Sequence, residues 1–199
     1  MILMRMSYRC IATLCLALLA AGQPAFGATG QWGIGELMRS LAQVEHSQAR
    51  FVERKYLKVL NAPLELSGTL TYTRPGQLEK RTLKPKPETL ELDGDRLTLT
   101  NPAGKRRAIR LQDYPVLWGF IESIRATLGG DIKALERFYR VELEGTSARW
   151  RLFLVPRERK MKDVISLIRL DGSQARVERI EVQEARGDRT VMKILEDGS

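Results

Sequence analysis

The sequence is poor in the side chains that most often bind metals or act as nucleophiles. Its 199 residues include two cysteines, Cys10 and Cys15, and one histidine, His46. Both cysteines lie in an N-terminal stretch that we expect to be removed, so the mature chain would have no disulfide. One histidine without cysteine excludes zinc sites of ordinary composition. His46 lies just off the apolar side of a predicted helix, which favours a structural role, and we expect no metal and no cofactor.

The motifs of the common enzyme classes are missing as well. The sequence contains neither Gly-x-Ser-x-Gly nor His-Glu-x-x-His, and it lacks a glycine-rich phosphate loop. Asp93-Gly94-Asp95 lacks the spacing of a metal-binding loop and predicts a hairpin turn between two alternating strands. We therefore expect no catalysis. An enzyme acting on envelope lipids or glycans through paired carboxylates is kept as an alternative.

Only one long apolar run occurs, at residues 10–21, and it follows two arginines and precedes Ala25-Phe26-Gly27. A basic front, a short apolar run and small residues at the cleavage positions are typical of a secretory signal peptide. The run is too short to span a membrane. We expect residues 1–27 to be a signal peptide cleaved near Gly27, which would leave one soluble domain of residues 28–199 in the periplasm.

Basic side chains outnumber acidic ones, with a net charge of +9 for the whole chain and +7 without Arg5 and Arg9. Export argues against a nucleic acid partner, which such a charge would otherwise favour. Phospholipid or glycolipid head groups and acidic protein faces are the anionic partners available in the envelope. The basic segments 105–107 and 157–160 are equally compatible with solvated hairpin tips on the outside of a sheet.

Hydrophobic spacing divides the chain into helical and extended segments. Residues 34–49 have an apolar stripe at helical spacing. Between residues 64 and 100, apolar and polar side chains alternate between turn signals, which predicts half-buried antiparallel strands. Residues 113–138 return to helical spacing, with Asp113 as a cap, Gly129-Gly130 as a helix end and Asp131 as the cap of a second helix. Alternation resumes around residue 149 and continues to about residue 195.

The order is therefore one helix, about six strands, a helical insertion and about five strands. Twist makes so large an antiparallel sheet curl, and its apolar concave face needs a cover. We predict a mainly β (α+β) fold, in which an incomplete β-barrel of about 11 strands is covered by a helical lid. Strand parity places Leu66, Leu70, Tyr72, Leu90, Leu92, Leu97, Leu99, Trp150, Leu152 and Leu154 on the cavity side. The predicted lid residues are Tyr114, Leu117, Trp118, Phe120, Ile121 and Ile124.

Residues 35–100 resemble the LolA family of periplasmic outer-membrane lipoprotein carriers. The resemblance rests on Ala49-Arg-Phe51, Ser67-Gly-Thr-Leu70, Tyr72-Thr-Arg-Pro75 and Asp93-Gly94. It implies a cavity that takes acyl chains, and it implies that Arg74 hydrogen-bonds to the lid and helps to control its opening. The stretch after the Arg-Pro turn lacks the aromatic residues usual in that family, so the chain is similar to a divergent member.

The resemblance implies a carrier that binds the acyl chains of a lipoprotein or envelope lipid and moves it between the inner and outer membranes. Its partners would be an inner-membrane donor and an outer-membrane acceptor, and it would act as a monomer. The alternative is a non-transport interaction or sensor module on the same scaffold, with a filled barrel and a binding face on the outside. Strand parity does not separate a cavity lining from a packed core, so both interpretations stay open.

Overall fold

The computed structural model describes residues 32–195. The predicted signal peptide and its cleavage site lie outside these residues. The helices are α1 (Ile34–Leu41), α2 (Pro115–Gly129), α3 (Ile132–Phe138) and α4 (Arg159–Lys162), with a 3-10 turn η1 (Leu111–Asp113). The strands are β1 (His46–Tyr56), β2 (Leu64–Thr73), β3 (Gln77–Lys84), β4 (Glu88–Asp93), β5 (Arg96–Thr100), β6 (Arg106–Arg110), β7 (Tyr139–Thr146), β8 (Arg149–Pro156), β9 (Ile165–Ser173), β10 (Arg176–Glu184) and β11 (Arg189–Leu195).

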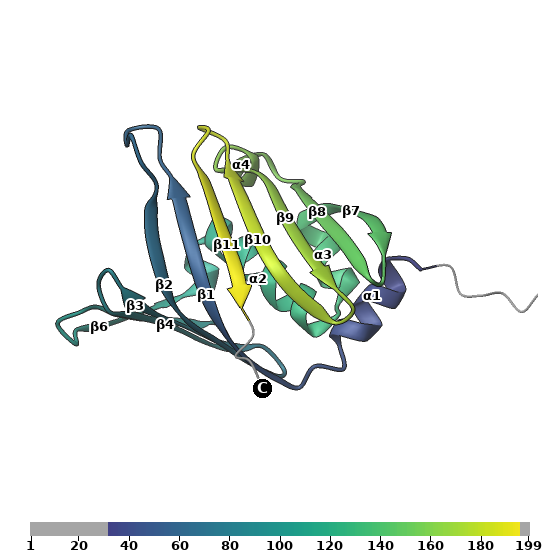
Figure 1. The fold of residues 1–199 in the computed structure, drawn as a ribbon, viewed down its shortest axis with the longest axis horizontal. Helices are drawn as coiled ribbons and strands as arrows, with labels where there is room; N and C mark the ends of the chain where they lie inside the picture. Colours follow the sequence, from purple (N-terminus) through teal and green to yellow (C-terminus); the bar gives the residue numbers. More distant parts are fainter. Residues whose placement is uncertain (1–31, 196–199) are drawn as a thin grey trace, which may run out of the picture. The chain divides into compact units, whose positions relative to one another are not determined.

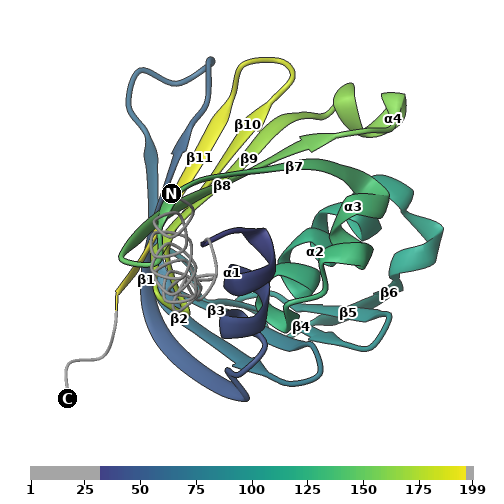
Figure 2. The same cartoon turned by 90° about the vertical axis from the view of Figure 1, so that its right-hand side faces the viewer.

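The eleven strands form one antiparallel sheet in the order β6-β5-β4-β3-β2-β1-β11-β10-β9-β8-β7. All neighbours in this order are also neighbours in the chain, except β1 and β11, which join the two series of hairpins. β6 and β7 are the two edge strands, so the sheet is open (Figure 1). The sheet curls around α1, α2 and α3, which lie on its concave side (Figure 2). The predicted fold class is therefore confirmed.

The predicted helix over residues 34–49 is wrong in its second half. α1 ends at Leu41, and β1 begins at His46. Ala49, Phe51 and Glu53 face inward and alternate with exposed or half-buried residues, which is the pattern of a strand. β1 pairs with β2 on one side and with β11 on the other, so long-range pairing overrides the local helical spacing.

The ends of α2 and α3 agree with the sequence except at one cap. Gly130 follows α2 with φ +71°, and Asp131 accepts a hydrogen bond from the Ala134 amide at the start of α3, 2.9 Å away. Asp113 does not cap α2, because it lies in η1 and forms an ion pair with Arg110 at 3.4 Å. The basic segment at 157–160 leads into α4 rather than forming a hairpin tip.

Two hydrophobic cores fill the space between the helices and the sheet. The large core joins α1, α2 and α3 to β7–β10 through buried residues that include Leu37, Leu41, Leu135, Trp150 and Leu152. The small core consists of Leu92, Leu97, Leu111 and Ile121, and it joins the first half of α2 to β4 and β5. Trp118 and Phe120 of α2 pack against both cores.

We expect replacement of Gly130 by alanine to destabilise the protein by at least about 1–2 kcal/mol, because Gly130 has a left-handed backbone. A Cβ atom there would also lie 2.2 Å from the Met38 carbonyl oxygen of α1. Urea denaturation measures the change. Gly35→Ala is the matched control, since its new Cβ would meet nothing within 4 Å among the described residues, apart from its chain neighbours and its own helix backbone. Equal stability of both variants would contradict the close approach of α1 and Gly130.

Candidate ligand-binding surface on the concave face

The concave face carries apolar side chains that neither core covers completely. In register, Ala49 and Phe51 of β1 lie opposite Leu70 and Gly68 of β2, and paired residues point to the same face. We call the inward-facing side chains of β11, β1 and β2, together with the adjoining Lys80 of β3, the central strip. Its strands lie between those of the two cores in the sheet. The apolar members that remain partly exposed are Leu66, Leu70, Met192 and Ile194.

The predicted cavity residues fall into three groups. Trp150, Leu152 and Leu154 are fully buried in the large core. Leu92 and Leu97 belong to the small core, Leu90 packs against it, and Tyr72 is buried. Leu66 and Leu70 are half-buried in the central strip, and Leu99 is exposed at the inner face of β5. All ten side chains lie on the predicted face, and whether any of them contacts a ligand stays a prediction.

The predicted lid segment is packed onto both cores rather than lying free. Ile121 is buried, while Leu117, Trp118 and Phe120 are half-buried and pack against the small core. The rings of Trp118 and Phe138 meet edge to face at 5.5 Å. Ile124 is half-buried, and Tyr114, which precedes the helix, is exposed.

A buried tyrosine ties α2 to the sheet. The Tyr139 hydroxyl at the start of β7 donates to the Gly119 carbonyl of α2 over 3.3 Å. Burial raises the pKa of Tyr139 to about 12, against the smaller opposing effect of a hydrogen bond with Ser123. The hydroxyl therefore stays protonated and remains a donor throughout the physiological pH range.

Two arginines attach the helices to turns of the sheet. Arg74, in the turn after β2, donates to the Ala42 carbonyl at the C-terminus of α1, so this bond goes to α1 and not to the predicted lid. Arg125 of α2 donates to the Gly94 carbonyl between β4 and β5 over 3.3 Å and pairs with Glu122 at 2.8 Å. Its Nε lies so near Gly76 that a Cβ there would be 2.8 Å away. The sequence pattern gave no indication of Arg125, because its contacts are long-range.

Tyr72 lies close to both of these arginines. Burial raises the pKa of the Tyr72 hydroxyl, and the charges of Arg74 and Arg125 oppose the rise without cancelling it. Within residues 32–195 the buried hydroxyl finds no hydrogen-bond partner. The end of β2 is therefore a place where polar groups of two helices and the sheet converge.

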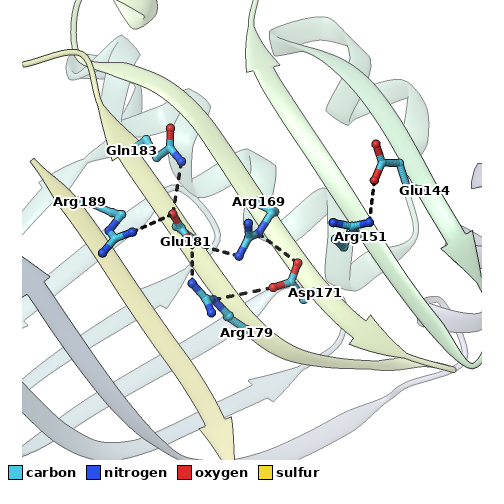
Figure 3. Close-up of polar contacts among 8 residues, drawn as sticks. All are labelled: Glu144, Arg151, Arg169, Asp171, Arg179, Glu181, Gln183 and Arg189. Carbon is cyan, nitrogen blue, oxygen red and sulfur yellow. Dashed lines mark hydrogen bonds and ion pairs between the residues drawn. The ribbon is translucent and has the colours of Figure 1, made fainter. Parts of the chain in front are cut away.

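The convex face carries a network of ion pairs, shown in Figure 3. Glu181 of β10 is buried under arginine side chains from three strands and lies 2.6 Å from Arg179 and 3.1 Å from Arg169. Burial alone would raise the pKa of Glu181, but hydrogen bonds from Arg179 and Gln183 and the charges of Arg169 and Arg179 lower it below its ordinary value. The carboxylate is therefore ionised at neutral pH.

Beside this network, the convex face has a depression of about 310 Å³. It is lined by Val52, Arg54, Tyr56, Arg179, Arg189, Val191, Lys193 and Leu195. A second, more open depression of about 550 Å³ lies at the β5–β6 edge and is lined by Asp93, Asp95, Arg96, Ala108, Ile109, Arg110 and Gln112. No predicted cavity residue lines either of them.

Neither a metal centre nor a membrane span is found in the part of the chain that the structure describes. Across residues 32–195, histidine, aspartate and glutamate side chains nowhere gather in a group of three that could hold a metal ion. None of the helices in this range is long and apolar enough to cross a membrane.

An open, curled sheet of eleven antiparallel strands with helices across its concave face places the chain in the LolA-like class of folds. Residues 27–196 match the family described as outer membrane lipoprotein carrier protein LolA-like, and the chain belongs to this family. The match covers the second half of the chain as well, where the resemblance read from the sequence was weak. A comparison with curated proteins gives no match.

Solved structures with a similar fold are distant in sequence. A LolA superfamily protein from Nitrosomonas europaea is 12% identical, with a TM-score of 0.41 over 83% of this chain and 92% of that one. A lipoprotein-sorting protein domain from Vibrio parahaemolyticus is 11% identical, with a TM-score of 0.43 over 83% and 92%. The MucA/MucB complex of Pseudomonas aeruginosa matches at 13% identity and a TM-score of 0.45, over 82% of this chain and 54% of that one.

We expect Glu181→Gln to lower the free energy of unfolding by about 1–3 kcal/mol at neutral pH, because the three arginines lose their shared carboxylate. The folded-state pKa is lowered, so the stability gained from ionisation is fully present above the ordinary value of 4.5. It is lost as the pH falls through the folded-state pKa. Urea denaturation of both proteins across this pH range measures the difference.

Glu144→Gln is the matched control. Glu144 pairs with Arg151 at 3.1 Å on the same face, but both side chains are more than half exposed. An exposed pair contributes at most about 1 kcal/mol. An equal loss in the two variants would show that burial gives Glu181 no special weight.

Proposed function

We propose that the protein is a periplasmic carrier that binds acyl chains of a lipoprotein or envelope lipid on the concave face of its sheet. The supporting observation is the central strip, whose partly exposed Leu66, Leu70, Met192 and Ile194 lie between two packed cores. Partly exposed apolar residues of α2, among them Leu117 and Ile124, offer a second apolar surface on the concave side. An acyl chain would complete the cover that the helices leave unfinished.

The energies suit reversible binding. About 14 methylenes, each contributing about 0.8 kcal/mol on burial, give roughly 11 kcal/mol before other costs. Association and ordering remove several kcal/mol of this. The remainder corresponds to micromolar affinity, which allows both capture from a donor and release to an acceptor.

Entry of an acyl chain between the central strip and α2 would require α2 to move relative to the sheet. The Arg125 bond to the Gly94 carbonyl and the Tyr139 bond to the Gly119 carbonyl are polar attachments of α2 that such a movement would strain, whereas the Arg74 bond holds α1. Arg125 would thus take, for α2, the role that the family resemblance gives to Arg74. In this proposal the carrier works without catalysis, as a monomer between an inner-membrane donor and an outer-membrane acceptor.

A non-transport interaction module is the second candidate, and the basic depression on the convex face favours it. Arg54, Arg179, Arg189 and Lys193 line that depression together with apolar side chains. An extended acidic segment of a partner protein would suit such a lining. Native mass spectrometry of the protein purified from its own periplasm separates the two candidates: a co-purifying acylated molecule supports the carrier, and an acidic protein partner without lipid supports the module.

We expect Leu70→Gln to weaken binding of a fluorescent fatty acid by about five- to tenfold, since the change removes apolar surface worth about 1 kcal/mol from the central strip. Thr71→Gln is the control, because Thr71 is the next residue of β2 and faces the convex side. Fluorescence titration measures both affinities. If Leu70→Gln folds normally and binds like the wild type, the central strip is not the acyl site.

Arg125→Met should raise the association rate of the same probe several-fold, because α2 loses its bond to the β4–β5 turn. Arg39→Met is the control: Arg39 also pairs with a glutamate three residues away, but on the exposed side of α1. Stopped-flow mixing measures both rates. An unchanged rate in Arg125→Met would argue against movement of α2 as the limiting step.

A further inference from the structure

The central strip contains charged side chains beside its leucines. Glu53 and Lys55 of β1 point inward, since they alternate with outward-facing Arg54, and Lys80 of β3 reaches Glu53 in an ion pair. The Lys55 ammonium lies 3.5 Å from the same carboxylate. The Lys80 ammonium also lies 5.0 Å from the centre of the Phe51 ring, on which it can rest as a cation.

The sheet is built so that Lys80 can reach across to Glu53. β2 lies between the strands of Lys80 and Glu53. Gly68 of β2 pairs with Phe51 on one side and with Thr82 on the other, and it has no side chain to fill the inner face. A Cβ atom at Gly68 would lie 1.9 Å from the Arg81 carbonyl oxygen, so β2 and β3 approach too closely there for any larger residue. Leu66 and Leu70 flank the gap on either side along β2.

The ion pairs of Glu53 with Lys55 and Lys80 are not explained by stability alone. Moving a carboxylate and an ammonium out of water costs several kcal/mol per ion, and apolar residues of similar size often stabilise a protein as well or better. Glu53 is only 3% exposed, yet it lies on the face where apolar neighbours would pack. The position of Glu53 therefore indicates a role in ligand selection.

Exposure and charge indicate what that role is. The side chains of Lys55 and Lys80 are 38% and 26% exposed, whereas that of Glu53 is 3% exposed. A molecule arriving at the strip therefore meets the side chains of the two lysines rather than that of Glu53. Two ammonium groups against one carboxylate leave one positive charge in excess, beside the half-exposed leucines.

We propose that Lys80 and Lys55 bind the anionic oxygen head group of an amphiphile whose acyl chain lies on Leu66 and Leu70. Glu53 positions the two ammonium groups and competes with the ligand for them. The inference rests on the proposed carrier function and adds to it the class of ligand: a chain headed by a carboxylate or a phosphate, rather than a neutral or cationic one.

Calorimetric titration of the purified protein with dodecanoate, dodecyl phosphate and dodecanol tests this, because the three probes share one chain length. We expect at least one of the anionic probes to bind about tenfold or more tightly than dodecanol. The anionic head that binds tighter identifies carboxylate or phosphate as the preferred source. If dodecanol binds as tightly as both anions, the proposal is overturned while the carrier function stands; if none of the three binds, the carrier function fails with it.

Two substitutions in the same group should act in opposite directions. Lys80→Met should remove most of the preference for the anions and leave dodecanol binding unchanged, whereas Glu53→Gln should tighten anion binding several-fold by freeing both ammonium groups. Lys162→Met, at the exposed end of α4, is the matched control and should change neither. If the ion pair were purely structural, both variants should lose anion binding, and that result would overturn the proposal. If Lys80→Met does not fold, Glu53→Gln and Lys55→Met, which should also lower the preference, provide the same test.

Discussion

The antiparallel pairing of β1 with β11 holds the two halves of the chain in one sheet, because every other pair of neighbouring strands is consecutive in the chain. Without this pairing, each half would expose a row of unpaired backbone groups and could not curl around a shared interior. The helices pack on the outer parts of the concave face through the two cores. At the join, Ala49 and Phe51 are buried, whereas Leu66, Leu70, Met192 and Ile194 stay partly exposed. The central strip is thus a consequence of the topology.

Local patterns predicted the parts of the fold that depend on local geometry. Alternation in β2, β4, β5 and β8, the glycine at the end of α2 and the cap at Asp131 all follow from constraints within a few residues. The end of α1 does not follow from such constraints. Apolar residues recur at helical spacing before Gln48, although this part of the chain includes the start of β1. The sequence contains no short-range signal that β11, some 140 residues later, pairs with this segment.

For the candidate site too, the sequence predicted the features that depend on local geometry and not those that depend on long-range packing. Strand parity identifies which side chains face inward, because the period of two is fixed by the backbone. It says nothing about which inward positions a helix then covers. Trp150 and Leu66 share the same face of the sheet, yet one is fully buried in a core and the other is half-buried in the central strip. Arg125 was missed for the same reason, since its bond to Gly94 depends on how α2 lies on the sheet.

Two buried carboxylates on opposite faces of the sheet illustrate how the same chemistry can serve different purposes. Glu181 on the convex face is surrounded by three arginines within one continuous ladder, which suits a rigid outer surface between β9 and β11 (Figure 3). Among residues 32–195, Glu53 on the concave face is paired with two flexible lysines, whose side chains stay partly exposed. Arginine binds carboxylates with a rigid, two-pronged geometry, whereas lysine is a mobile point charge that exchanges partners readily. The convex network is therefore suited to holding the sheet in shape, and the concave group to giving up its partner when an anion arrives.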